Sequence, residues 1–195
     1  MMVSLLLKIL RFYTGNRIIP PPLLPDQLAE SLDQYLYVNS ELQSELLIYS
    51  TTTHELLSRT KTTPSHLPSH KLLSAEIYIH PVHRFTLYIS NRGSRRLNRE
   101  NPELGPGTED GIGEGDSITI ILLSGDSEVE RIIYLKTGLD WIRGMRISDD
   151  GKYLACCGEV GGGLAVYEIT GERGEVLTLI AKDEGVKDVN CVLWV

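Results

Sequence analysis

The 195-residue sequence lacks the local motifs that mark several enzyme classes. It has no Gly-x-Ser-x-Gly elbow, no P-loop and no His-Glu-x-x-His motif, which argues against the hydrolase, nucleotidase and zincin chemistries that depend on them. The glycine-rich run 111–115 is flanked by carboxylates that would repel a phosphate. His80 and His83 have no further ligands near them in the sequence, and we interpret them as a solvated turn pair. We therefore predict no metal and no cofactor.

Cysteine is scarce, and charge of one sign prevails. Three cysteines, Cys156, Cys157 and Cys191, make an odd and irregularly spaced set that does not form a disulfide framework. At least one of the first two should face the core as a small apolar residue. This usage fits a reducing compartment, and we predict a cytoplasmic location. The net charge of −7 argues against nonspecific nucleic-acid binding.

Long hydrophobic runs are also missing. The apolar stretch Met1–Leu10 is too short to span a bilayer and lacks the features of a signal peptide, so we predict no membrane association. A helical period is suggested only over Asp26–Leu36, where one short helix is expected. Residues 1–32 match no repeat, and we interpret them as an atypical leader before a domain at 33–195.

One short pattern occurs three times. The copies are β-rich runs that open on an aromatic residue and end near a charged one, Tyr35–Glu41, Phe85–Arg92 and Tyr153–Glu159, and two further β-runs follow each copy. Strand groups that recur every 50 to 70 residues or so indicate a repeat architecture, and four short strands per unit is the blade of a β-propeller. We predict an all-β fold, a partial β-propeller of about three four-stranded blades.

The unit boundaries follow from turn signals. The first unit, about 33–62, is predicted to lack its first strand, and the second begins at Ser74. Residues 93–116, rich in glycine, are predicted to be a surface loop. The third unit starts at Asp140 and turns at Asp149-Asp-Gly151, a hairpin signal. The closing run Asn190–Val195 is predicted to be one more strand.

The charged residues that close the repeated runs are the candidate site. Glu41, Arg92 and Glu159 occupy equivalent strand ends, which lie on one rim of a propeller, and Arg143 could reach the same cleft. An arginine fork matches a carboxylate, and a glutamate beside it can transfer a proton. The alternative is that these are ordinary exposed charges at strand ends.

At these residues the chain resembles the lactonase-type seven-bladed propellers, which include bacterial 6-phosphogluconolactonase and fungal 3-carboxy-cis,cis-muconate cyclase. The matching pieces are Tyr35–Leu42, Ala75–Pro81, Leu87–Gly93 and Gly138–Met145. Details such as Arg92-Gly-Ser-Arg-Arg96 resemble the fungal cyclase branch more. The resemblance implies a cofactor-free intramolecular lyase of aromatic catabolism (an isomerase of the β-ketoadipate pathway). It implies that Arg92, with Arg143, binds an anionic substrate while Glu41 transfers a proton. Glu159, at the equivalent end of the third repeated run, is a further candidate for substrate binding.

Two alternatives remain open. One is a lactone hydrolase acting on 6-phosphogluconolactone, which the acidic composition favours less than a carboxylate substrate. The other is a non-catalytic half-propeller, either an interaction module or a remnant, because the chain has about half the ring and lacks the family's other site groups. Ser40 and the segment His80–Thr86 also depart from the family pattern. Open strand edges would favour self-association.

Overall fold

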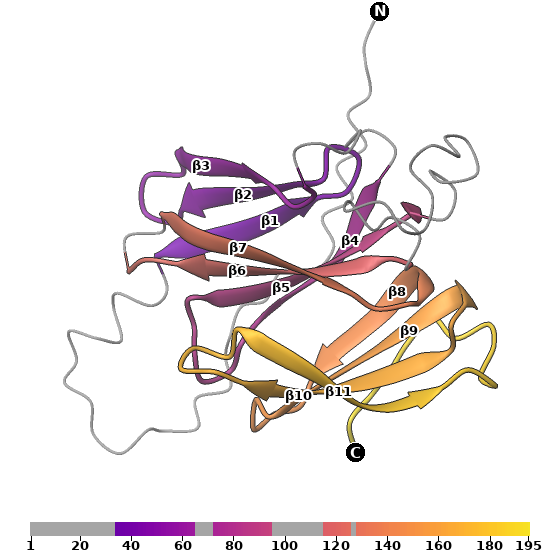
Figure 1. The fold of residues 1–195 in the computed structure, drawn as a ribbon. Helices are drawn as coiled ribbons and strands as arrows, with labels where there is room; N and C mark the ends of the chain where they lie inside the picture. The colour runs from indigo at the N-terminus through magenta and orange to yellow at the C-terminus, as the bar shows by residue number, and fades with distance from the viewer. Residues whose placement is uncertain (1–33, 65–71, 95–114, 126–127) are drawn as a thin grey trace, which may run out of the picture.

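The computed structural model describes residues 34–64, 72–94, 115–125 and 128–195. Within these ranges the chain forms three antiparallel sheets (Figure 1). The strands are β1 (Tyr35–Ser40), β2 (Glu45–Ser50), β3 (Leu56–Lys61), β4 (Leu73–Ile79), β5 (Thr86–Arg92), β6 (Ser117–Leu123), β7 (Val129–Lys136), β8 (Asp140–Ile147), β9 (Tyr153–Gly161), β10 (Leu164–Thr170) and β11 (Val176–Asp183).

Each sheet is a meander in which sequence neighbours pair. The first blade is β1-β2-β3, the second is β4-β5-β6-β7, and the third is β8-β9-β10-β11. The second and third blades have four strands each, and the described residues supply three strands to the first. The sheets lie side by side with the second blade between the other two, so the described strands form an open arc (Figure 1). The prediction of a partial β-propeller is confirmed.

Two apolar clusters hold the blades together. Leu46 and Ile48 of the first blade pack with Leu87, Ile89 and other residues of the second. A larger cluster joins the second and third blades, with its fully buried members including Tyr88, Ile118, Leu139, Ile142, Leu154 and Cys156. Because each blade buries a face only against its neighbour, the alternating apolar positions of the strands define how the blades stack.

The β8–β9 turn forms where the sequence predicted a hairpin. Gly151 has a positive φ of 74°, a conformation that glycine adopts without steric cost. The Ser148 hydroxyl donates to Asp150 at 2.7 Å, and the Lys152 amide donates to the same carboxylate at 3.1 Å. The turn is therefore fixed by its own side chains.

Some expectations fail or fall outside the described ranges. The run Asn190–Val195 is not a strand, so that prediction is wrong: an apolar run becomes a strand only where another strand supplies hydrogen bonds. In the expected helix at 26–36, Tyr35 and Leu36 already belong to β1. Gln34 forms a bend. Residues 26–33 of that segment, the leader at 1–32 and most of the loop at 93–116 lie outside the described residues. Within the described ranges we find no helix with the length and apolarity that a membrane crossing requires.

Candidate functional site

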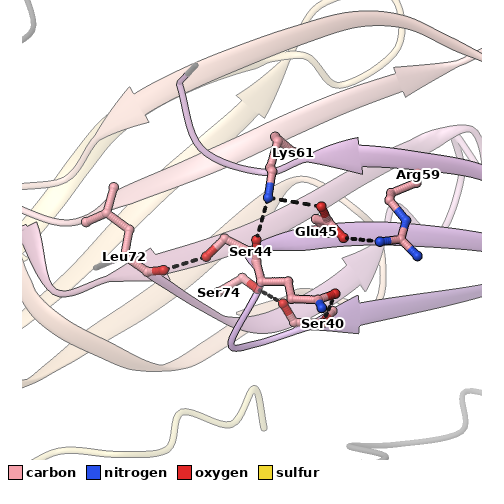
Figure 2. A network of polar contacts seen from close by, with 8 residues as sticks. Ser40, Ser44, Glu45, Arg59, Lys61, Leu72 and Ser74 are labelled. Carbon is pink, nitrogen blue, oxygen red and sulfur yellow. Dashed lines mark hydrogen bonds and ion pairs between the residues drawn. The ribbon is translucent and has the colours of Figure 1, made fainter. Parts of the chain in front are cut away.

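Glu41 opens the turn that joins β1 to β2, and this turn is anchored to the second blade. The Ser44 hydroxyl donates to the carbonyl oxygen of Leu72 at 2.5 Å, and the Ser74 hydroxyl donates to that of Ser40 at 3.2 Å (Figure 2). The Asn39 amide adds a bond of 3.0 Å to the carbonyl oxygen of Ala75. The position of Glu41 is therefore set by contacts between two blades.

A second glutamate in this region has a structural role that the sequence did not indicate. Glu45, at the start of β2, is buried and forms ion pairs of 3.2 Å with Arg59 and 2.9 Å with Lys61 of β3 (Figure 2). Lys61 also donates to the carbonyl oxygen of Gln43 at 3.1 Å. The cations of the first blade thus neutralise Glu45 within their own sheet.

Arg92, the last residue of β5, is the buried cation of the site. It is only 7% exposed, and its Nη2 donates to Oε1 of Glu41 in an ion pair. Its Nε is buried and has no hydrogen-bond partner among the described residues. A buried N–H without an acceptor is uncommon in folded proteins. One guanidinium N–H of Arg92 is therefore left without an acceptor among the described residues.

The third blade contributes an aromatic wall that the sequence analysis missed. The guanidinium carbon of Arg92 lies 5.3 Å from the ring centroid of Trp141 in β8, within the range of a cation–π contact. Trp141 also has a positive φ of 66°, which is unusual for a bulky residue. In the sequence, Trp141 was marked by its place inside the family-like segment Gly138–Met145. The residue type alone does not reveal that its backbone is strained.

Arg143 and Glu159 form the second ion pair of the candidate set. Arg143 Nε and Glu159 Oε2 are 3.0 Å apart, with side chains 48% and 36% exposed. Exposed pairs of this kind contribute little to stability. The four predicted residues thus form two ion pairs, Glu41–Arg92 and Arg143–Glu159. Strand β8 carries Arg143 and also Trp141, whose ring contacts Arg92.

The histidine pair differs from the expectation of a solvated turn. His80 is only 3% exposed. Its Nδ1 accepts the amide protons of Val82 and His83 at 3.1 and 2.9 Å, and its Nε2 lies 3.0 Å from the carbonyl oxygen of Gly151. His80 is thus a neutral link between the second and third blades, at the end of β4 far from Arg92. The prediction of a solvated position was wrong for His80. Its hydrogen-bond partner, the carbonyl oxygen of Gly151, lies in a turn 71 positions away in the sequence.

Two of the three cysteines lie in the core. Cys156 and Cys157 are buried and Cys191 is exposed, which confirms the core position expected for one of the first two. Burial raises the pKa of the Cys156 and Cys157 thiols, which keeps them protonated. Within the described ranges, no group of three or more His, Cys, Asp or Glu residues is placed to hold a metal ion.

A family model described as "Lactonase, 7-bladed beta-propeller" matches residues 28–194. The chain belongs to this lactonase propeller family. The match agrees with the propeller blades that the described strands form. No curated protein sequence matches the chain.

Solved structures support the same fold. A protein from Lactobacillus plantarum superposes with a TM-score of 0.61 at 22% identity, covering 81% of this chain and 40% of that one. A proposed 6-phosphogluconolactonase from Bacteroides fragilis gives 0.59 at 19%, covering 81% and 38%, and one from Bacteroides uniformis gives 0.58 at 20%, covering 81% and 39%. The chain spans about two fifths of the length of these proteins.

Proposed function

We propose that this chain is a sector of a lactone-processing propeller, and that its Glu41–Arg92 pair acts on a small anionic lactone or on its open form. The observation that carries the proposal is the buried Arg92, whose Nε has no acceptor among the described residues while Nη2 is held by Glu41. Membership of the lactonase family supports the same class of chemistry.

Arg92 is proposed to bind the negative charge of the substrate. Nε and one terminal nitrogen of a guanidinium form the fork that a carboxylate matches with two parallel hydrogen bonds. Nε is already desolvated by its burial, so an incoming oxygen would satisfy a group that otherwise lacks a partner. The Trp141 ring covers the guanidinium from one side and would leave the other directions to the ligand.

Glu41 is proposed to move the proton. It is paired with Arg92, and a carboxylate within reach of water acts as a general base. In hydrolysis, water attacks the lactone carbonyl carbon and gives a proton to Glu41. The ring C–O bond then breaks, and the proton returns to the departing ring oxygen. Ring closure of a carboxymuconate would use the same groups. A substrate carboxylate oxygen adds to one carbon of a double bond, and Glu41, after taking up a proton from solvent, delivers that proton to the neighbouring carbon and becomes a carboxylate again.

The charge balance of the site does not separate the two substrates. Each predicted cation is matched by a glutamate, Arg92 by Glu41 and Arg143 by Glu159. A phosphate monoester carries up to two negative charges, and a carboxymuconate carries three carboxylates. We retain carboxymuconate cyclisation as the finer proposal because the segment Arg92–Arg96 resembles the cyclase branch, with Arg143 and Glu159 as outer substrate-binding residues and 6-phosphogluconolactone hydrolysis as the comparison.

The test is a pair of assays on the purified 195-residue chain, one following carboxymuconate consumption by absorbance and one following 6-phosphogluconolactone hydrolysis. We expect turnover of at least one substrate above the spontaneous rate. Arg92→Ala should lower kcat/KM about 10²-fold or more, as loss of a charge clamp does. Arg84→Ala, which removes an exposed arginine in the turn before β5, is the matched control. A folded chain inert toward both substrates would contradict the proposal and favour a non-catalytic module.

A further inference from the structure

Asp116 is a buried carboxylate whose two oxygens join separate parts of the candidate site. It precedes β6 and is 1% exposed. Oδ1 accepts hydrogen bonds from the amide and the hydroxyl of Ser94, at 3.0 and 2.6 Å. Oδ2 accepts hydrogen bonds from the amides of Trp141 and Ile142, at 2.6 and 3.2 Å. One side chain thus connects the residue just after β5 in the second blade with the start of β8 in the third.

Both groups of donors belong to the surroundings of Arg92. Ser94 follows Arg92 by two positions, so a bond at Ser94 fixes the path of the chain as it leaves β5. Trp141 provides the ring that lies over the guanidinium, 5.3 Å from its carbon. Asp116 therefore holds Arg92 through the backbone on one side and the aromatic wall on the other.

The conformation of Trp141 gives Asp116 a specific task. A φ of 66° at a tryptophan is strained, and such conformations persist only where the surroundings enforce them. The register of β8 with β9 shifts at this point, between Asp140 and Ile142. The two hydrogen bonds from the Trp141 and Ile142 amides hold this irregular backbone in place.

The bonding of Asp116 also argues against direct contact with a substrate. Its oxygens accept four hydrogen bonds from the protein, and its side chain is closed off from solvent. A carboxylate engaged in this way has little capacity left to act on a ligand. Its role must therefore be exerted through the residues that it holds.

We propose that Asp116 is the positioning residue of the site: it holds the Trp141 ring over Arg92 and thereby sets the direction in which Arg92 presents its free N–H. The proposal rests on the proposed function for its kinetic consequence, but not for its structural one. In catalysis, a displacement of about 1 Å at a positioned group costs about 10²-fold in rate.

The experiment uses the two tryptophans of the chain. Trp194→Phe leaves Trp141 as the single tryptophan reporter. In this background we compare Asp116→Asn with Asp150→Asn. The latter is a matched control, because Asp150 accepts hydrogen bonds from the Ser148 hydroxyl and the Lys152 amide in the exposed β8–β9 turn. Asp116→Asn should shift Trp141 emission to longer wavelength and increase its quenching by acrylamide, and Asp150→Asn should change neither. Unaltered emission and quenching in a folded Asp116→Asn protein would overturn the proposal.

Kinetics separate positioning from a purely structural role. On whichever substrate is turned over, Asp116→Asn should lower kcat about 10²-fold while the melting temperature remains above the assay temperature. If Asp116→Asn does not fold, Ser94→Ala removes one of the four bonds and should shift Trp141 in the same direction. A chain inert toward both substrates would refute the proposed function, yet the fluorescence comparison would still decide the role of Asp116.

Discussion

Arg92 and Glu41 are 51 positions apart in the sequence, on neighbouring blades, and form an ion pair at the strand ends where β1 and β5 finish. The pairing follows from the repeat itself. Equivalent strand ends of adjacent blades meet at one rim, and there one blade provides the carboxylate and the next provides the guanidinium. Because the two side chains are in contact, one substrate molecule can reach both of them.

Replacing Arg92 with lysine tests whether the fork geometry matters in addition to the charge. Lysine keeps the positive charge but has no Nε–H and no planar fork. We expect Arg92→Lys to lower kcat/KM about 10- to 100-fold, equivalent to one charge-assisted hydrogen bond. Steady-state kinetics on the active substrate measure this, and a lysine variant with wild-type kcat/KM would reduce the role of Arg92 to charge alone.

Tyr88→Phe tests how the second and third blades are joined. The Tyr88 hydroxyl is buried and donates to the carbonyl oxygen of Gly174 at 2.5 Å. Removing it leaves a buried carbonyl without this donor, at a cost of about 1–3 kcal/mol. Urea denaturation followed by circular dichroism should show a lower midpoint with an unchanged slope. Tyr134→Phe, on the partly exposed strand β7, should leave the midpoint unchanged.

His80 should make stability depend on pH. Burial, reinforced by His83, lowers the pKa of His80 below its usual 6.5. The unfolded chain therefore binds more protons than the folded chain between the two pKa values, so stability falls as pH drops below about 6.5. Protonating Nδ1 would also break the bonds from the Val82 and His83 amides.

Urea midpoints at pH 7.5 and 5.5 measure this effect. We expect a loss at the lower pH that shrinks in His80→Gln and persists in His54→Gln, where the histidine is exposed. An equal pH dependence in the native protein and in His80→Gln would show that other groups cause it.

Thiol labelling tests the placement of the cysteines. Of the three, only Cys191 is exposed, and the buried pair has raised pKa values that oppose thiolate formation. Native protein treated with Ellman's reagent should therefore release one equivalent quickly and the other two only after denaturation. Cys191→Ser should abolish the fast phase. Rapid reaction of all three thiols would contradict the packing of β9.

The sequence was informative wherever local pattern and repeat agree. Runs such as Phe85–Arg92 combine β-favouring residues with turn signals, and their recurrence predicted the blades and the shared rim of Glu41 and Arg92. It was uninformative where a contact depends on a distant backbone. The burial of His80 depends on Gly151, and the strained Trp141 depends on Asp116. The run Asn190–Val195 has the composition of a strand but does not form one, because strand formation also requires a partner.

The most direct test of the proposed chemistry is a double-mutant cycle on kcat/KM with Arg92→Ala, Glu41→Gln and the two combined. The two residues bind the substrate and transfer the proton as one unit. We therefore predict that each single change lowers kcat/KM about 10²-fold or more, and that the double change lowers it by about the same factor. Costs that simply add, or single variants with wild-type kcat/KM, would contradict the account.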